Sequence, residues 1–254
     1  EHAVLHLLYA RFWHHVLHDL GLVSTREPFQ KLYNQGMIQG EDGQKMSKSR
    51  GNVINPDDVV MEFGADSFRL YEMFMGPLDK AKPWNTKGLQ GCHRFILKTW
   101  KLYIKHKDIS KNIKNNDTKT ETLFHQTIKK ITDDLNKLQF NTAISQLMIL
   151  TNHLAKQKSV SRKLLENMLI LLNPFAPHIT EELNHFYGNS IVITKQKWPK
   201  WDSEKIKEET IDIPVQINGK LKANISVNIE NDSKEEIINK AKNSEKILII
   251  LKGK

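Results

Sequence analysis

Apolar residues recur at helical spacing near the N-terminal end of the chain. Five of them fall on one helical face, and Gly21 follows the last: Leu5, Leu8, Phe12, Val16 and Leu20. This pattern predicts a helix over residues 2–20 that packs on one face. Residues 36–55 show little periodicity and are rich in Gly, Ser, Lys and Asn, which predicts a polar loop.

A short helix should follow that loop. The sequence Asn-Pro-Asp-Asp at residues 55–58 supplies an N-cap, a first-position proline and two first-turn acids. Gly64 is expected to end this helix, and Asp66 is expected to cap the next one.

From residue 89 to Pro174 the apolar spacing stays helical. Four stripes predict the helices of a bundle: Cys92 to Tyr103, Phe124 to Leu138, Ile144 to Leu154 and Leu164 to Leu172. We assign their apolar residues to the core. Residues 106–120 are polar and predict an exposed connector between two of the helices.

The period changes from helix to strand after Gly188. Residues 211–217 and 221–227 alternate apolar and polar side chains across Asn218-Gly219, a strong hairpin signal. Ser233 and Glu236 form a capping box for a short helix, and residues 247–251 are expected to form another strand. Together these segments predict a small α+β domain.

Composition narrows the protein class. The 254 residues carry 38 Lys and Arg against 29 Asp and Glu, a formal net charge of +9, and 39% of them are hydrophobic, which excludes disorder of the whole chain. The hydropathy predicts no membrane span. The single cysteine, Cys92, excludes an internal disulfide framework and a cysteine-based zinc site, and it favours the cytoplasm. Because the chain opens at Glu1 within an apolar pattern, we expect it to be part of a longer protein.

Most of the basic residues are lysines, whose compact charges suit phosphate contacts better than the reading of bases. Lys98, Lys101 and Lys105 lie at helical spacings on one face. Taken alone, this run fits a solvated helix face as well as a nucleic-acid surface, and the solvated face is the default.

Two histidine pairs have the i, i+4 spacing of helical zinc ligands: His2 with His6, and His14 with His18. A Glu in the pattern of zinc proteases is missing after His2, and no cysteine is near either pair. We therefore expect no metal site. His14, His15 and His18 are expected at the surface.

The segment richest in chemistry runs from Gly43 to Asn52. It contains Lys45, Lys48 and Arg50 together with two hydroxyl groups, and glycines flank it. Such a loop can move ammonium groups onto a polyphosphate, where they stabilise the negative charge that grows as phosphorus is attacked. A basic surface turn is the alternative that composition alone favours.

The sequence Lys45-Met46-Ser47-Lys48-Ser49 resembles, letter for letter, the second signature of class I aminoacyl-tRNA synthetases. Residues 1–12 resemble the segment that lines the leucine and ATP pocket in the leucyl-tRNA synthetase family. Residues 173–183 and 215–221 are similar to that family too, so the resemblance covers nearly the whole chain.

The resemblance implies a mainly α fold in four parts. Residues 1–50 would be the C-terminal remnant of a class I Rossmann-type catalytic domain, and residues 51–88 connecting helices in the stem-contact region. Residues 89–204 would form a helical bundle that binds tRNA, similar to an anticodon-binding domain. Residues 205–254 would form a small α+β tRNA-binding domain whose last strand we expect to be cut off or altered.

The resemblance also implies an activity, the ATP-dependent attachment of leucine to tRNA(Leu) through leucyl-adenylate, with Mg²⁺ accompanying the ATP and no tightly bound metal or organic cofactor. The implied roles are catalysis by Lys45 and Lys48; ATP binding by Lys45, Met46, Ser47, Lys48 and Ser49; leucine and adenylate binding by Glu1, His2 and His6; and tRNA binding by Lys98, Lys101, Lys105, Lys220 and Lys222.

Parts of the family pattern are missing from this sequence. The first signature, His-x-Gly-His, does not occur, and there is no room for an inserted editing domain. We therefore expect the chain to be the C-terminal part of a leucine-tRNA ligase, inactive alone and completed by the missing N-terminal part. The alternative is a non-catalytic tRNA-binding module or a subunit of a split synthetase.

Overall fold

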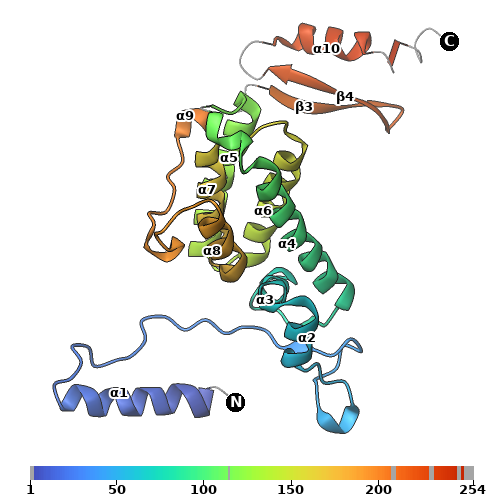
Figure 1. Cartoon of the computed structure of the whole chain (residues 1–254). Helices are drawn as coiled ribbons and strands as arrows, with labels where there is room; N and C mark the ends of the chain where they lie inside the picture. Colours follow the sequence, from blue (N-terminus) through green and yellow to red (C-terminus); the bar gives the residue numbers. More distant parts are fainter. Residues whose placement is uncertain (1–2, 114, 207–209, 229–231, 245–246, 249–254) are drawn as a thin grey trace. The chain divides into compact units, whose positions relative to one another are not determined.

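A computed structural model describes all residues except 1–2, 114, 207–209, 229–231, 245–246 and 249–254 (Figure 1). The described chain is mainly helical, as the sequence predicted, and it contains two two-stranded sheets, of which only the hairpin near residue 218 was predicted. It divides into two compact units. Residues 1–53 and 77–84 form the N-terminal unit, and residues 54–76 and 85–254 form the bundle unit.

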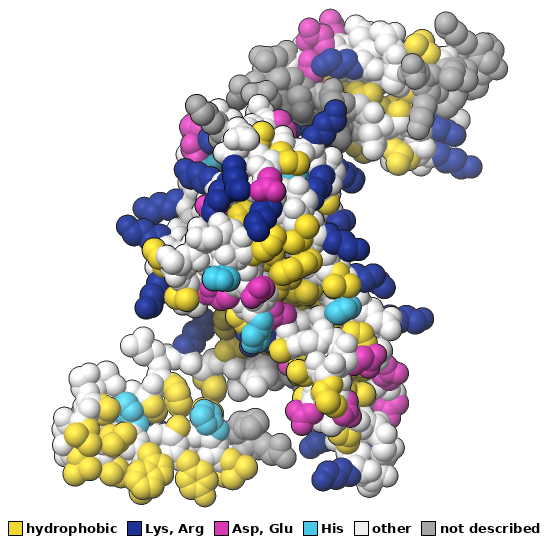
Figure 2. Space-filling view, in the orientation of Figure 1, with side chains coloured by type: hydrophobic (Ala, Val, Ile, Leu, Met, Phe, Trp, Pro, Cys, Tyr) yellow, Lys and Arg dark blue, Asp and Glu magenta, His cyan; other side chains and the backbone are white. Residues whose placement is uncertain are grey.

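The N-terminal unit begins with a long helix. A π-helical segment, Ala3–Leu8, continues into α1, Tyr9–Asp19, and Gly21 follows with a positive φ of 69°. The predicted packing of this helix is wrong within the described chain, because its apolar stripe is exposed: Phe12 and Trp13 are each 61% exposed. Figure 2 shows the hydrophobic side chains gathered along α1.

The other element of the N-terminal unit is a parallel ribbon of β1, Ile38–Gln39, and β2, Lys82–Pro83. The backbones approach so closely that a Cβ on Gly36 would lie 2.0 Å from the Lys80 oxygen. Between the two strands the chain leaves this unit, forms α2 and α3, and returns. Residues 54–76 are therefore an insertion between the two strands of the ribbon.

Helices α2, Pro56–Phe63, and α3, Ala65–Phe74, form that insertion. The predicted N-cap is confirmed, because the Asn55 side chain accepts a hydrogen bond from the Asp57 N–H. Gly64 ends α2 with a φ of 83°. The predicted role of Asp66 is wrong: its carboxylate binds the N-terminus of a distant helix, α8 (Pro177–Phe186), instead of capping α3.

Five helices form the bundle: α4, Thr86–His106; α5, Thr118–Asn136; α6, Phe140–Lys156; α7, Arg162–Leu172; and α8, Pro177–Phe186 (Figure 1). The predicted stripes supply much of the core, including Tyr103, Ile131, Ile144 and Leu147, which are fully buried. The 106–120 connector is less exposed than predicted, because Ser110 and Thr120 are buried and residues 109–112 form a 3-10 turn.

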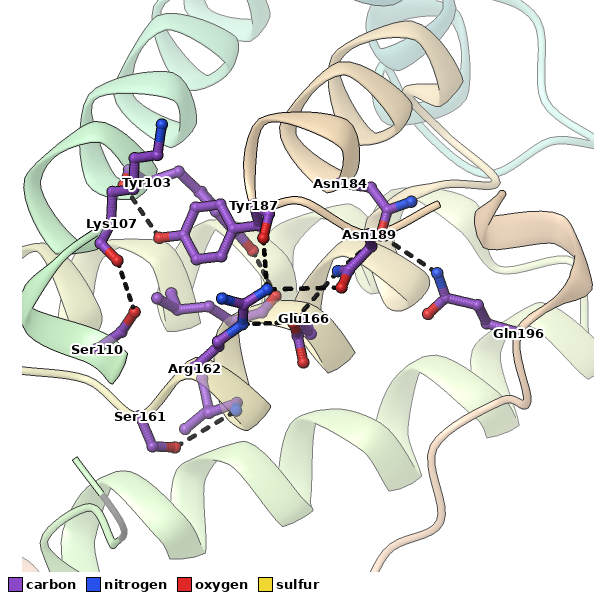
Figure 3. A network of polar contacts seen from close by, with 12 residues as sticks. Tyr103, Lys107, Ser110, Ser161, Arg162, Glu166, Asn184, Tyr187, Asn189 and Gln196 are labelled. Carbon is purple, nitrogen blue, oxygen red and sulfur yellow. Dashed lines mark hydrogen bonds and ion pairs between the residues drawn. The ribbon is translucent and has the colours of Figure 1, made fainter. Parts of the chain in front are cut away.

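A polar network joins the start of α7 to the end of α8 (Figure 3). Arg162 donates to Glu166 at 2.8 Å and to the backbone oxygen of Tyr187, and Asn189 donates to Glu166 at 3.2 Å. The Tyr187 hydroxyl donates to the backbone oxygen of Tyr103 at 3.0 Å. These bonds fix α4, α7 and α8 against one another inside the bundle.

Beyond α8 a 3-10 turn, Ile193–Lys195, and a short helix, α9, Ser203–Ile206, lead to the antiparallel strands β3, Thr210–Ile217, and β4, Lys220–Asn228. Asn218 and Gly219 both have positive φ, as the predicted tight turn requires. The capping box of α10, Lys234–Asn243, is confirmed. The predicted strand at 247–251 is wrong at Ile247 and Leu248, which are helical, and its remainder lies outside the described residues.

Candidate functional site

The loop from Gly40 to Asn52 starts as a tight turn at the end of β1. The Gly40 N–H donates to the Gln44 oxygen at 2.9 Å, and Gln39 pairs with Lys45 across the turn. Gly43 takes a positive φ of 71°, which an L side chain rarely adopts. The pairing with Gln39 of β1 therefore fixes the position of the Lys45 backbone.

Asn52 braces the far end of the loop against its beginning. Its side-chain oxygen accepts from the Ser47 N–H at 2.9 Å, and its amide nitrogen donates to the Asp42 carboxylate at 3.1 Å. The Gln44 N–H and the Asn52 amide, which both donate to Asp42, lower the pKa of this carboxyl. Asp42 therefore stays ionised and keeps its acceptors available.

The segment between these anchors is a single 3-10 turn, Lys48–Arg50. The Ser47 and Ser49 hydroxyl groups lie 3.2 Å apart, and Arg50 donates to the Gln44 side chain at 3.3 Å. Gly51 closes the turn in the left-handed region, at a φ of 67°. The serines therefore shape the loop backbone that carries the lysines.

Lys45 and Lys48 are exposed, and Met46 is half-buried between them. No ion pair of either lysine occurs in the part of the chain that the structure describes. Two free ammonium groups on a backbone with fixed ends can reach an anionic ligand without first breaking an internal salt bridge. The loop is therefore suited to binding phosphate groups.

The residues expected to line a leucine pocket are only partly visible. Glu1 and His2 lie outside the described residues. His6 is exposed, and its ring centroid lies 6.1 Å from that of Phe29. No described contact joins His6 to the 40–52 loop, so the structure does not bring these two groups together.

Two of the remaining N-terminal histidines, His14 and His15, contact the segment that follows α1, whereas His18 lies 3.7 Å from Asp19 within the helix. His14 lies 2.7 Å from the Thr25 oxygen, and His15 lies 3.3 Å from the Glu27 carboxylate. Arg11 donates two hydrogen bonds to Glu27, which lower the pKa of Glu27 to about 2. Among the described residues, no cluster of three or more His, Cys, Asp or Glu could hold a metal ion.

Two of the three expected tRNA-binding lysines on α4 have partners inside the bundle. Lys98 donates to the Asn152 side chain. Lys105 donates to the backbone oxygens of Ala155, at 3.2 Å, and Gln157, at 2.7 Å. Lys101 is exposed, with no partner among the described residues.

Two further cations on this face were not among the predicted tRNA-binding residues. Lys87 and Arg94 precede Lys101 by 14 and 7 residues, spacings that place all three on one side of α4. All three are exposed, and α4 contains no Asp or Glu. Figure 2 shows basic side chains beside α4. The seven-residue spacing is the signal that identifies this row, which we call the α4 basic row.

The hairpin adds Lys220 and Lys222 at the start of β4, and both are exposed. A register shift between Val215 and Gln216 interrupts the alternation of side chains beside Lys222, so these two lysines are close along β4 but do not share one face of the ribbon. No helix among the described residues is long and apolar enough to cross a membrane.

Comparison with known families divides the chain in two. Residues 9–84 match the family of class I tRNA synthetases for I, L, M and V. Residues 117–238 match the anticodon-binding domain of tRNA ligases. The first match contains the 40–52 loop, and the second contains α5 to α9, both strands of the hairpin and the first half of α10.

Two curated relatives are similar over the whole chain. The leucine–tRNA ligase of Chloroherpeton thalassium is 49% identical over 257 residues, and that of Chlorobaculum tepidum is 50% identical over 256. Each match covers 100% of this chain and 32% of the relative. The chain therefore spans about a third of the length of these enzymes.

Solved structures agree with this match. A leucyl-tRNA synthetase of Agrobacterium radiobacter K84, in a ternary complex with tRNA and LeuAMS, has a TM-score of 0.71 and 34% identity over 99% of this chain and 34% of its own. Methionyl-tRNA synthetase of Mycobacterium tuberculosis shares the fold over 70% of this chain and 42% of its own, with a TM-score of 0.52 and 13% identity. The chain is thus a homologue of the C-terminal part of leucine–tRNA ligases, and its residues 9–84 match the class I tRNA synthetases.

Proposed function

We propose that this chain is the part of a leucine-tRNA ligase that supplies the phosphate-binding loop and the tRNA-binding surfaces. The complete enzyme would attach leucine to tRNA(Leu) in two steps. The observation that carries this proposal is the 40–52 loop, which presents Lys45 and Lys48 without internal partners in the described chain, within a sequence about half identical to leucine–tRNA ligases. The buried thiol of Cys92 and a role in protein synthesis favour the cytoplasm.

In the first step, an oxygen of the leucine carboxylate attacks the α-phosphorus of Mg·ATP. The bond to pyrophosphate breaks, and leucyl-adenylate forms. We assign to Lys48 the main contact with the leaving pyrophosphate, with Lys45 assisting, because ammonium groups aimed at growing negative charge lower the barrier. Met46, Ser47 and Ser49 set the loop conformation around the ATP.

In the second step, a hydroxyl group of the terminal adenosine of tRNA attacks the carbonyl carbon of leucyl-adenylate, and AMP leaves. The protein acts mainly by positioning these groups. Glu1, His2 and His6 remain our proposed contacts with leucine and the adenylate, on the strength of their place in the family pattern.

The tRNA surface that we propose differs from the sequence expectation. We keep Lys101 in the proposed tRNA-binding surface and add Lys87 and Arg94, because these three cations of the α4 basic row have no described internal partner. Lys220 and Lys222 supply a second patch. Lys98 and Lys105 contribute less to RNA binding than expected, since their ammonium groups are engaged with α6.

The second candidate is a non-catalytic tRNA-binding module or one subunit of a split synthetase. The observation in its favour is that the chain spans 32% of its relatives. In both candidates the missing N-terminal part is the partner that would cover the exposed apolar stripe of α1.

Leucine-dependent exchange of labelled pyrophosphate into ATP tests the proposal. The 254-residue chain alone should show no exchange, and addition of the N-terminal part of a close relative, in one chain or as a second chain, should restore it. Robust exchange by the chain alone would contradict the proposal that adenylate formation also needs the N-terminal part. No exchange after completion, together with retained tRNA binding, would favour the non-catalytic module.

A further inference from the structure

A basic segment between α8 and α9 has no part in the sites described above. Residues 195–201 read Lys-Gln-Lys-Trp-Pro-Lys-Trp, which gives three cations, two tryptophans and no Asp or Glu. Lys195 ends the preceding 3-10 turn, and the other six residues lie outside helices and strands. We call residues 195–201 the strap. Lysines interleaved with aromatic side chains are typical of surfaces that bind single-stranded nucleic acids.

Two polar side chains hold the strap on the bundle. The Gln196 amide donates to the Asn184 side chain of α8 at 3.2 Å, a contact drawn in Figure 3. The Trp198 ring nitrogen donates to the Thr132 hydroxyl of α5 at 2.9 Å. The strap therefore has fixed contacts with both α8 and α5.

The last two residues of the strap, Lys200 and Trp201, lie between two further fixed points. Pro199, which precedes them, is buried. The N–H of Asp202, which follows them, donates to the His125 ring nitrogen of α5 at 3.0 Å. Because the backbone is held on either side of Trp201, little conformational freedom is lost when a ligand packs on its ring.

Exposure distinguishes Trp201 from the other tryptophans of the bundle unit. Trp201 is 40% exposed, whereas Trp100 and Trp198 are half-buried. An indole ring in contact with water gains free energy when a ligand covers its apolar face. Flat π systems such as nucleobases stack on such a ring.

The lysines decide which ligand suits this ring. Lys195, Lys197 and Lys200 are exposed, and none of them makes an ion pair in the part of the chain that the structure describes. The next acid along the chain, Asp202, accepts from the Glu204 N–H at 3.0 Å. Unpaired cations beside an aromatic ring complement a ligand with repeated negative charge and exposed flat groups. Single-stranded RNA has both, whereas duplex RNA keeps its bases stacked inside.

We propose that the strap binds a single-stranded segment of RNA, with Trp201 stacked on an unpaired base and the three lysines in contact with neighbouring phosphates. This inference takes RNA as the ligand from the proposed function. It goes beyond that function by adding a contact made through a base, whereas the α4 basic row and the hairpin lysines supply charge alone. Every base has a π face, so the strap recognises that a base is unpaired rather than which base it is.

Fluorescence anisotropy with the 254-residue chain tests the strap. The probes are a labelled oligouridine of about ten nucleotides and a duplex RNA of the same length. Trp201→Leu removes the ring but keeps an apolar side chain and the net charge. Its affinity for oligouridine should fall about fivefold or more with an unchanged salt slope, and its affinity for the duplex should stay within about twofold of the wild type. Trp201→Phe, which keeps a ring, should retain most of the affinity.

Trp13→Leu is the matched control. Trp13 is 61% exposed, but Arg11 is the only Lys or Arg of its helix, α1, so this variant should bind both probes like the wild type. Replacing the three strap lysines by Gln should weaken binding of both probes and make the salt slope shallower.

Three results would overturn the proposal: no binding of oligouridine by the wild type, equal binding of oligouridine by Trp201→Leu and the wild type, or an equal loss of oligouridine and duplex binding in Trp201→Leu. The proposed function fails through a different measurement, the absence of pyrophosphate exchange in the complete wild-type ligase.

Discussion

The ammonium nitrogen of Lys105 lies 2.7 Å from the backbone oxygen of Gln157 and donates a hydrogen bond to it. Gln157 directly follows α6, whose last carbonyl groups have no partners within the helix. The same ammonium also reaches the Ala155 oxygen, so a side chain of α4 closes the C-terminal end of α6. A lysine that looked like a surface charge therefore holds two helices together.

Lys105→Met should destabilise the chain by about 1 kcal/mol, because a cation at a helix C-terminus and its hydrogen bonds are removed. Urea unfolding at neutral pH measures the change. Lys101→Met, the same substitution one turn away at a side chain with no described partner, should stay within about 0.5 kcal/mol of the wild type. Equal effects of the two variants would show that the contact with α6 contributes no stability.

Neutralising the α4 basic row should weaken RNA binding. In the triple variant Lys87→Gln, Arg94→Gln and Lys101→Gln, fewer phosphates of the RNA are neutralised and fewer counterions are released. The slope of log affinity against log salt should therefore become shallower by roughly 0.7–0.9 per phosphate that the row neutralises. Fluorescence anisotropy with labelled tRNA(Leu) over a range of salt concentrations measures this slope.

The control for the row removes the same number of charges elsewhere. Lys111→Gln, Lys129→Gln and Lys130→Gln affect ammonium groups that pair with Asp108, Asp133 and Asp134. This variant should keep most of the wild-type slope. If both triple variants bind RNA equally weakly, net charge rather than the row determines RNA binding.

Lys48→Ala in the complete ligase should slow adenylate formation by about 10²–10³-fold, or roughly 3–4 kcal/mol, because the ammonium acts on charge that develops in the transition state. Leucine binding should change little. Single-turnover measurement of adenylate formation separates the two effects. Lys31→Ala, at an exposed lysine of the same unit, is the control. A change confined to the Michaelis constant for leucine would contradict the role of Lys48.

Gly40→Ala should disturb the brace of the 40–52 loop. A Cβ at this position would lie 2.7 Å from the Asp42 carboxylate and 2.8 Å from the Asn52 amide nitrogen. We expect adenylate formation to fall by about tenfold, because the loop lysines lose their fixed base. At Gly91 the nearest atom would be 3.8 Å from a Cβ, so Gly91→Ala should be nearly neutral. Wild-type exchange by Gly40→Ala would show that the brace has no part in catalysis.

His106 should make the bundle sensitive to acid. Burial, with a smaller contribution from Lys105, lowers the pKa of His106 below its ordinary value of 6.5, and neither ring nitrogen has a partner in the described chain. The unfolded chain therefore takes up a proton first as the pH falls. Stability should be fully present above about pH 6.5 and should decline as the pH drops toward the lowered pKa.

Urea unfolding at several pH values between about 5 and 8 tests this dependence. His106→Leu should reduce the loss of stability on acidification. It should not abolish it, because burial also lowers the pKa of His125 and His153. An unchanged pH profile in His106→Leu would show that His106 is not one of the responsible groups.

Features whose partners are close along the chain could be predicted from the sequence. The Asn55 cap, the Asn218-Gly219 turn and the Ser233–Glu236 capping box all formed as predicted, because each depends on atoms only a few residues apart. The helical stripes of the bundle were equally readable, since the spacing of apolar residues decides which side faces the core. The five-residue match at 45–49 identified the candidate loop before its geometry was known.

Helix packing decided instead which side chains far apart in the sequence contact one another. Asp66 binds α8 more than a hundred residues away, and Lys98 and Lys105 bind α6, because packing places these groups together and local propensity carries no information about it. Ile247 and Leu248 are helical although a strand was predicted, because a short apolar run is compatible with both a helix and a strand. The tertiary contacts around such a run decide between the two. The seven-residue spacing of the α4 basic row was visible in the sequence, but only the packing showed that Lys98 and Lys105 are engaged with α6.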